Sequence, residues 1–253
     1  MVNVDTFETV KIVTLDRPDV RNAFNDDLIE ALTKVFTTRG DTRLIILRGN
    51  GPTFCAGGDL NWMRKASGYT QAENEADALK LAKLFQAMCE NPAVVVVLAH
   101  GAAFGGGCGL VAAADVAIAV TGTKFCFSEV RLGLIPATIS PFVIPKIGHG
   151  HARRLFATAD VFDAAHACQI GLVHFEVPTM EAAGIELKRQ VELVLANGPQ
   201  AVARSKQLAQ CAPLSLEESA RWLAEARSGE EAKEGVAAFL EKRKASFVLG
   251  CKS

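Results

Sequence analysis

The 253-residue sequence predicts an α/β fold, because segments with strand patterns alternate with segments with helical patterns along most of its length. The clearest strand pattern is residues 93–99 (AVVVVLA), a β-branched run typical of a strand with both faces covered. The clearest helical signal is Thr70 followed by Glu73, a capping box that opens a long helix. Hydrophobic residues make up 49% of the chain and charged residues 22%, so a sizeable core can be buried.

The predicted elements follow in order, each ended by turn-forming residues. Strands are predicted over residues 10–15, 43–48, 93–99 and 115–120. Helices are predicted over residues 25–36, from Thr70 to just before Asn91-Pro92, and over the short segments 110–114 and 163–170. The last third of the chain is predicted to form amphipathic helices over residues 180–196, 200–212, 215–227 and 229–244. We expect residues 1–195 to form the core and residues 196–253 to form a helical region suited to oligomerisation.

Composition and simple motifs exclude several classes of function. The formal net charge is −1, so neither nucleic acid nor an anionic membrane is predicted as the main partner. The first residues show no basic stretch followed by an apolar one, so we expect no secretory signal, and the apolar runs are too short to span a bilayer. Seven cysteines without a C-x-x-C pair disfavour a disulfide framework and a zinc ribbon. We expect a cytoplasmic protein without a metal site.

Two glycine-rich loops each follow a predicted strand. Residues 54–60 (FCAGGDL) come after one strand, and residues 101–110 (GAAFGGGCGL) come after the next and open a helix. Small residues let backbone N–H groups point outward, and a helix N-terminus adds partial positive charge. Two such loops at the ends of adjacent strands can aim two N–H donors at one oxygen, as an enolate or a tetrahedral oxyanion requires.

The spacing of the glycines and their neighbours excludes other known functions of glycine-rich loops. Leu110 stands where G-x-G-x-x-G requires its last glycine, and the sequence has neither the Gly-Lys-Ser/Thr of a phosphate-binding loop nor the G-x-S-x-G of a serine hydrolase. The alternative that these glycines only form tight turns and close packing stays open at this point.

Four ordered motifs resemble those of the enoyl-CoA hydratase/isomerase (crotonase) superfamily. Residues 54–60 resemble its F-x-A-G-x-D-hydrophobic motif. Residues 100–107 (HGAAFGGG) resemble its N-G-x-x-x-G-G-G segment, with His100 in place of the usual Asn. Residues 15–23 (LDRPDVRNA) resemble its amino-terminal L-N-R-P…N-A segment, and residues 229–247 resemble its carboxyl-terminal helix. The resemblance covers nearly the whole chain.

The resemblance implies a crotonase fold, which is a ββα spiral core with a helical carboxyl-terminal trimerisation region. It implies a CoA thioester as the substrate and no metal or redox cofactor, and it places the thioester oxygen on the N–H groups of Gly58 and Gly106. The other substrate contacts that it implies are Arg21, Asn22, Ala23, Ala56, Gly57, Asp59, Leu60, Phe104, Gly109, Pro136 and Lys242. The implied assembly is a homotrimer or a dimer of trimers.

The carboxylates depart from the usual family pattern. Family hydratases usually carry two glutamates, one two residues after the glycine triplet and the other twenty residues further on. The first position is Gly109 here, and the second is Glu129, which the resemblance makes the main acid/base. Residues 127–145 resemble a narrower bacterial branch that hydrates methylglutaconyl-CoA or isohexenylglutaconyl-CoA and also has glycine at the first position.

The resulting interpretation is a hydratase of branched 2-enoyl-CoA thioesters. Two alternatives stay open: a double-bond isomerase that uses one carboxylate, and a non-catalytic acyl-CoA-binding or RNA-binding homologue. We expect Asp59 to cap the helix after its loop and Cys55 and Cys108 to be small buried hydrophobes.

The protonation of Glu129 is expected to depend on burial. Apolar neighbours disfavour a charged carboxylate, so Phe127, Leu132 and Ile135 are expected to raise its pKa, while nearby N–H donors oppose that rise.

Overall fold

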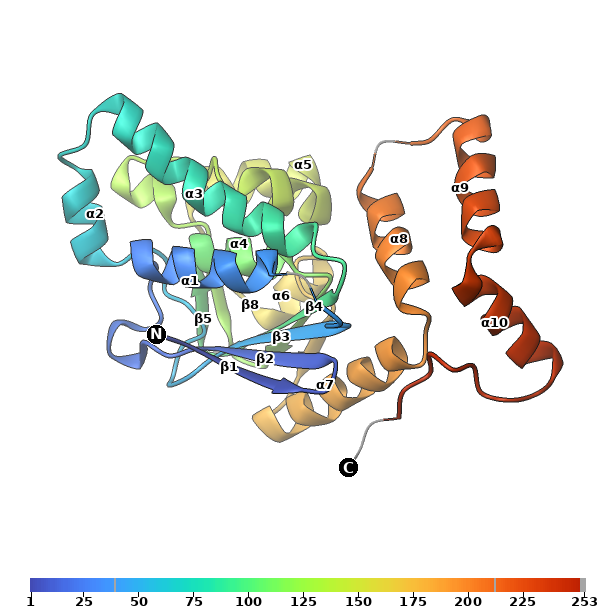
Figure 1. The fold of residues 1–253 in the computed structure, drawn as a ribbon. Helices are drawn as coiled ribbons and strands as arrows, with labels where there is room; N and C mark the ends of the chain where they lie inside the picture. The colour runs from blue at the N-terminus through green and yellow to red at the C-terminus, as the bar shows by residue number, and fades with distance from the viewer. Residues whose placement is uncertain (39, 212, 251–253) are drawn as a thin grey trace.

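The computed structural model describes residues 1–38, 40–211 and 213–250, which form an α/β core joined to a helical carboxyl-terminal region (Figure 1). The larger of two sheets has the strand order β1-β2-β3-β4-β6-β9. In this sheet β1 is antiparallel to β2, and the other neighbouring strands are parallel. Its strands are β1 (Val2–Phe7), β2 (Val10–Leu15), β3 (Leu44–Gly49), β4 (Val94–Ala99), β6 (Val116–Val120) and β9 (Phe175–Val177).

The chain alternates between this sheet and a smaller one with the order β5-β7-β8. The strands of the smaller sheet are β5 (Ala102–Phe104), β7 (Lys124–Cys126) and β8 (Phe162–Asp163). Thus β4 is followed by β5 and β6 by β7, each pair leading into a helix. After β3, Cys55 forms a single parallel bridge with Ala103 of β5, so this turn also reaches the smaller sheet. The repeated order of two strand segments and a helix makes the core a ββα spiral, which is the predicted fold class.

Helices cover both faces of the larger sheet, with α1 and α3 on one face and α7 on the other (Figure 1). The α-helices of the core are α1 (Asp26–Thr37), α2 (Leu60–Ala66), α3 (Gln71–Cys89), α4 (Gly106–Ala113), α5 (Ser140–Thr158), α6 (Ala164–Gln169) and α7 (Met180–Leu195). The carboxyl-terminal helices are α8 (Pro199–Gln210), α9 (Leu216–Ser228) and α10 (Glu230–Leu240). Two 3₁₀ helices are η1 (Pro18–Val20) and η2 (Glu129–Leu132).

Strand β4 explains how the core is divided. All six of its residues are buried. Val95 and Val97 pack in the cluster that contains α1 and α3, whereas Val94 and Val96 pack in the cluster that contains Ala183 of α7. Because successive side chains of a strand point to opposite faces, a strand covered on both faces needs an unbroken apolar run. The prediction drawn from the β-branched run is therefore confirmed.

The predicted helix starts are largely confirmed. Thr70 and Glu73 form the capping box of α3, and Asn25 and Asp163 accept hydrogen bonds as the N-caps of α1 and α6. In contrast, α4 begins at Gly106, four residues before the predicted start. Its residues from Gly107 onward are buried, and this burial outweighs the poor helix propensity of glycine.

Other predicted boundaries need correction. Helix α10 ends at Leu240, and Lys242 has a left-handed φ of 55°, so the basic end of the predicted helix lies outside it. The predicted end of α8 at residue 212 lies outside the described residues. Helix α5 was not predicted, because Gly148 (φ 73°) and an internal Pro145 interrupt its helical pattern.

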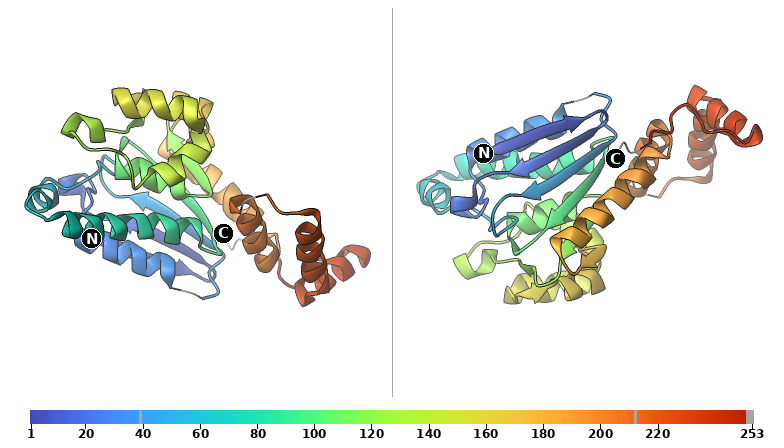
Figure 2. Two further views of the ribbon diagram at one scale, coloured as in Figure 1. Left: turned by 90° about the horizontal axis from the view of Figure 1, so that it is seen from above. Right: turned by 90° about the horizontal axis from the view of Figure 1, so that it is seen from below.

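The carboxyl-terminal helices α8–α10 extend away from the core (Figure 2), and buried cations tie them to it. Arg43, beside β3, donates hydrogen bonds to the carbonyls of Val194, Asn197 and Phe247. Lys206 of α8 pairs with Asp115 at 2.6 Å and donates to the carbonyls of Asn91 and Ala93. Both cations lie near the amino-terminal ends of the central strands, opposite the glycine loops. None of the described helices is both long and apolar enough to cross a membrane.

Gly101 connects β4 to β5 at a point where only glycine fits. It has a φ of +65°, and a Cβ atom would overlap the carbonyl oxygen of Pro52. We expect Gly101→Ala to lower the free energy of unfolding by more than the ~1–2 kcal/mol that a left-handed backbone costs an L-residue. Urea unfolding followed by circular dichroism measures this loss.

Gly122→Ala is the matched control, because Gly122 also has a positive φ of +86° but a Cβ atom there meets nothing within 4 Å. Both variants are compared at one protein concentration, since assembly shifts apparent stability. Equal losses in the two variants would show that contact with Pro52 contributes nothing.

Candidate active site

Three chain segments lie side by side at the carboxyl-terminal ends of the central strands. Cys55 donates from its N–H to the carbonyl of Ala102 (3.1 Å), and Phe104 donates back to Cys55 (3.0 Å). Phe24 donates to the carbonyl of Gly57 (2.7 Å) in the same way. The two predicted glycine loops and the segment that contains residues 21–24 therefore form one continuous backbone surface.

Glycine is required where the two loops touch. A Cβ atom on Gly107 would lie 2.6 Å from the carbonyl oxygen of Cys55, and one on Gly57 would lie 3.2 Å from that of Phe104. Gly105 adopts a φ of +49° where β5 turns into α4. Larger residues at these points would force the loops apart, so the glycines set the distance between them.

Gly58 and Gly106 present the N–H groups that the sequence singled out. Neither N–H has a hydrogen-bond acceptor among the residues that the structure describes. Gly106 is the first residue of α4, whose early N–H groups have no partner within the helix and carry the positive end of its dipole. An oxygen that gains negative charge during a reaction is stabilised by donors of this kind.

Glu129, the first residue of η2, lies directly beside Gly105. Its Oε1 is 3.2 Å from the point where a Cβ atom on Gly105 would stand, and its Oε2 is buried without a hydrogen-bond partner. Burial raises the pKa of this carboxyl, and a backbone hydrogen bond opposes the rise. The expected direction is confirmed, but Leu132 and Ile135 are 59% and 74% exposed and cannot supply most of the shielding.

Gly109 is buried in α4, and protein atoms occupy the space beside it. A Cβ atom there would lie 2.6 Å from both the ring of Phe85 and the Cγ2 of Ile139. Phe85 is fully buried, with Phe24 edge-on to it at a centroid distance of 6.4 Å. A glutamate at position 109 would have to displace this packing, so in this chain Glu129 lies beside the loops without a second carboxylate from that position.

The predicted substrate contacts at residues 21–23 fall into two groups, exposed and buried. Arg21 is exposed, with a left-handed φ of 53°. Asn22 is fully buried, and its amide bonds the carbonyls of Asn50 and Thr53 and the N–H of Arg17. The Asn22 side chain is thus used to hold the loops together, and Ala23 is buried beside it.

The other predicted contact residues, from the two loops and the segment after η2, have mixed exposure. Asp59 caps α2 by accepting from the N–H of Asn61 (2.8 Å), as expected, and Arg17 pairs with the same carboxylate at 2.9 Å. Leu60 is 77% exposed at the start of α2. Ala56 and Phe104 are half-buried, and Pro136, which follows η2, is buried.

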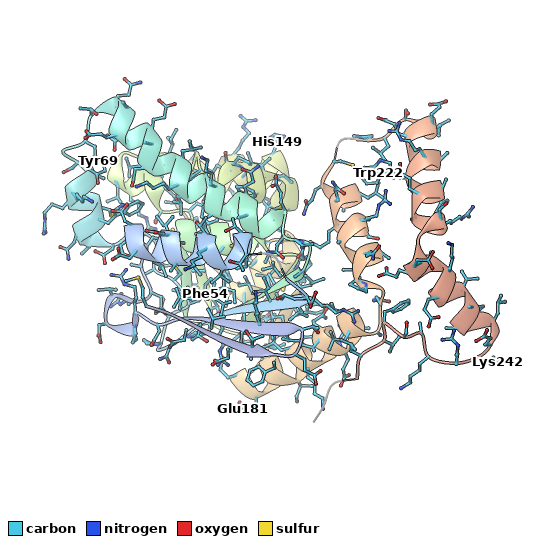
Figure 3. All side chains as sticks on the ribbon, viewed as in Figure 1. Phe54, Tyr69, His149, Glu181, Trp222 and Lys242 are labelled. Carbon is cyan, nitrogen blue, oxygen red and sulfur yellow. The ribbon has the colours of Figure 1, made fainter. Side chains whose placement is uncertain are left out.

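Lys242 lies far from these loops within one chain. Figure 3 shows Phe54, at the start of the first loop, inside the core and Lys242 at the far end of the carboxyl-terminal helices. A contact between Lys242 and CoA bound at the loops therefore requires the Lys242 of a neighbouring copy.

Three residues near the site were not assigned roles from the sequence. Phe24 packs against the second glycine loop, since a Cβ atom on Gly106 would lie 2.8 Å from its ring. The Nε2 of His100 bonds the carbonyl of Gly51 (2.8 Å), which joins two neighbouring turns. The Ser128 hydroxyl lies beside Gly105 and Glu129. The position of Ser128 next to Glu129 in the sequence was the available signal.

The cysteines near the site have the expected character of small buried side chains. Cys55 and Cys108 are fully buried, and burial raises the pKa of Cys55 to about 12 and that of Cys108 well above the ordinary value. Both remain neutral thiols at physiological pH and are poor nucleophiles. The described part of the chain contains no group of three or more His, Cys, Asp or Glu side chains arranged to hold a metal.

Comparison with known proteins shows the family to which the chain belongs. Residues 5–249 match the family model for enoyl-CoA hydratase/isomerase. A crotonyl-CoA hydratase from Syntrophomonas wolfei is 35% identical over 95% of each chain. Two solved structures are similar over nearly their whole length: an enoyl-CoA hydratase from Shewanella pealeana (36% identity, TM-score 0.91, 97% of this chain and 95% of that one) and Pseudomonas aeruginosa AtuE (35%, 0.94, 98% and 99%). The chain therefore belongs to the enoyl-CoA hydratase/isomerase family.

Proposed function

We propose that this protein adds water to 2-enoyl-CoA thioesters, with branched, 3-methylglutaconyl-like acyl groups as its leading substrates. The observation that carries the proposal is the buried, unpartnered carboxylate oxygen of Glu129 beside Gly105, next to the free N–H of Gly106. Such a pair joins a proton acceptor to an oxyanion donor within one small volume. The crotonyl-CoA hydratase among the relatives supports a hydration reaction.

The geometry suits a stepwise addition. Glu129 takes a proton from a water molecule as the water oxygen bonds to Cβ of the enoyl group. The electrons of the C=C bond then move onto the thioester oxygen, where the N–H groups of Gly58 and Gly106 stabilise the enolate. Glu129 returns its proton to Cα, and the product is the 3-hydroxyacyl-CoA.

The branched substrate class is supported by the single carboxylate. Position 109 cannot hold a glutamate unless both Phe85 and Ile139 move, so the site differs from the usual two-glutamate arrangement. The segment of residues 127–145 resembles the branch with the same glycine. The CoA carrier would lie along the backbone of residues 56–60 and beside Arg21, without a further cofactor. We place this chemistry in the cytoplasm.

One alternative function has a specific observation in its favour. A single carboxylate can move a proton from one carbon of an acyl chain to another, so the absence of an acid at Gly109 also suits a double-bond isomerase. Only a hydratase increases the mass of the thioester by one water molecule, and this difference separates the two.

The first test is product analysis with a panel of CoA thioesters. We expect 3-methylglutaconyl-CoA to be converted to its 3-hydroxy product faster than crotonyl-CoA, measured by mass spectrometry. Calorimetry should show binding of acetyl-CoA but not of acetate, because the backbone surface suits a long polar carrier. Shifted double bonds without added water would indicate the isomerase. Binding without any turnover would indicate a non-catalytic homologue.

The second test concerns the proton carrier. Glu129→Gln keeps the shape of the side chain but cannot carry a proton, so kcat should fall by about 10²–10⁴ while the Kd for acetyl-CoA changes little. Asp59→Asn tests the carboxylate that caps α2 at the end of the first loop. It is expected to lower the free energy of unfolding and to lower kcat by much less than Glu129→Gln does.

The pH profile follows from the raised pKa. Glu129 must be ionised to accept a proton, so kcat/KM should be lost as the pH falls through a pKa above the ordinary value for glutamate. A profile that is flat over the acidic range, or a Gln variant that keeps most of its turnover, would assign the proton transfer to another group.

We also propose a homotrimer or a dimer of trimers. Helices α8–α10 contact the core little and expose large apolar side chains. The exposed set is Leu208, Leu216, Leu223, Val236, Phe239 and Leu240. Exposed large apolar side chains gathered in one region of a chain are typical of an interface between subunits.

The third test is the mass in solution. Sedimentation velocity at micromolar concentration should give a species of three or six chains, and Phe239→Glu should shift it toward smaller species because Phe239 is 82% exposed in one chain. Glu230→Lys, nine residues before Phe239 and therefore on the opposite side of the same helix from it, is the control. A stable wild-type monomer would contradict the assembly.

A further inference from the structure

A hydratase must hold its water as well as deprotonate it. The attacking oxygen has to present a lone pair to Cβ while one of its hydrogens moves to the base. A second hydrogen-bonding group fixes that orientation. Glu129 can be the base, but Gly109 has no side chain, and Phe85 and Ile139 occupy the space where one would stand. The second group must therefore come from another position.

Ser128 has the required location. Its Oγ is 3.7 Å from the point where a Cβ atom on Gly105 would stand, and the Oε1 of Glu129 is 3.2 Å from that point. The two side-chain oxygens thus flank the same face of Gly105. That residue immediately precedes the N–H of Gly106, so the hydroxyl, the carboxylate and the oxyanion donor belong to one site.

The Ser128 hydroxyl is also uncommitted. Ser128 is the N-cap residue of η2, yet its side chain makes no capping bond. Within the described ranges it forms no other hydrogen bond, although its backbone carbonyl accepts from the N–H of Arg131. The buried Oε2 of Glu129 likewise has no partner. Two neighbouring polar groups without protein partners are suited to share a water molecule.

We propose that Ser128 is a catalytic residue that holds the attacking water, which deepens and rests on the proposed hydratase function. Its Oγ accepts a hydrogen bond from one O–H of the water while Glu129 accepts the proton of the other. A lone pair of the water oxygen forms the bond to Cβ, and the C=C electrons pass to the thioester oxygen. Ser128 keeps its own proton throughout, and Glu129 later delivers the proton it took to Cα.

The test compares Ser128→Ala with Ser128→Thr on the best substrate of the wild-type protein. We expect the Ala variant to lose about 10-fold or more in kcat for hydration, because a buried hydrogen bond to the reacting water is lost. Its Kd for butyryl-CoA, a saturated thioester that has no C=C bond to hydrate, should stay within twofold. The Thr variant keeps the hydroxyl and should recover most of the rate.

Ser228→Ala is the matched control, since the Ser228 hydroxyl bonds only the carbonyl of Ala224 within its own helix α9. Hydration by Ser128→Ala within twofold of the wild-type rate would overturn the role of Ser128 and leave the proposed function intact. A Thr variant as slow as the Ala variant, or a parallel loss of butyryl-CoA affinity, would also overturn it. A wild-type protein that hydrates no thioester would overturn both proposals.

Discussion

The close backbone contact between the two glycine loops is the constraint on which the rest of the site depends. Cys55 pairs with β5, and Gly107 lies so near the Cys55 carbonyl that any side chain would overlap it. This contact holds side by side the two loops that carry the unpartnered N–H groups of Gly58 and Gly106. It is possible because β3 and β4 are neighbours in a parallel sheet, so both loops leave the same edge.

The sequence predicted those parts of the fold and site that depend on local patterns. The buried run of β4, the capping box at Thr70 and the two loops each leave a local signature, and the structure contains them as expected. Tertiary features left no such signature. The occupied space beside Gly109 depends on a contact with Phe85, which is 24 positions away in the numbering, and the exposure of Leu132 depends on how η2 turns. Periodicity alone cannot show either.

The attachment of the carboxyl-terminal helices shows a second kind of dependence. Arg43 and Lys206 are charged, yet both are mostly buried and bond backbone carbonyls at strand ends and the α7 terminus. Burying a cation without such partners would be costly. These bonds attach α8 and the segment after α10 to the core, while the large apolar side chains of the carboxyl-terminal helices remain exposed.

The packing around Gly109 has a consequence for how this site can change during evolution. A glutamate at position 109 meets the Phe85 ring and Ile139 together, so its effect depends on what occupies those two positions. The substitution is therefore epistatic: in this background it disrupts the core before it can add a second acid. A lineage with this packing must first lose bulk at both Phe85 and Ile139, which opens a cavity and lowers stability. An intermediate of lowered stability thus separates the site with one carboxylate from a site with two, and this favours retention of the single carboxylate.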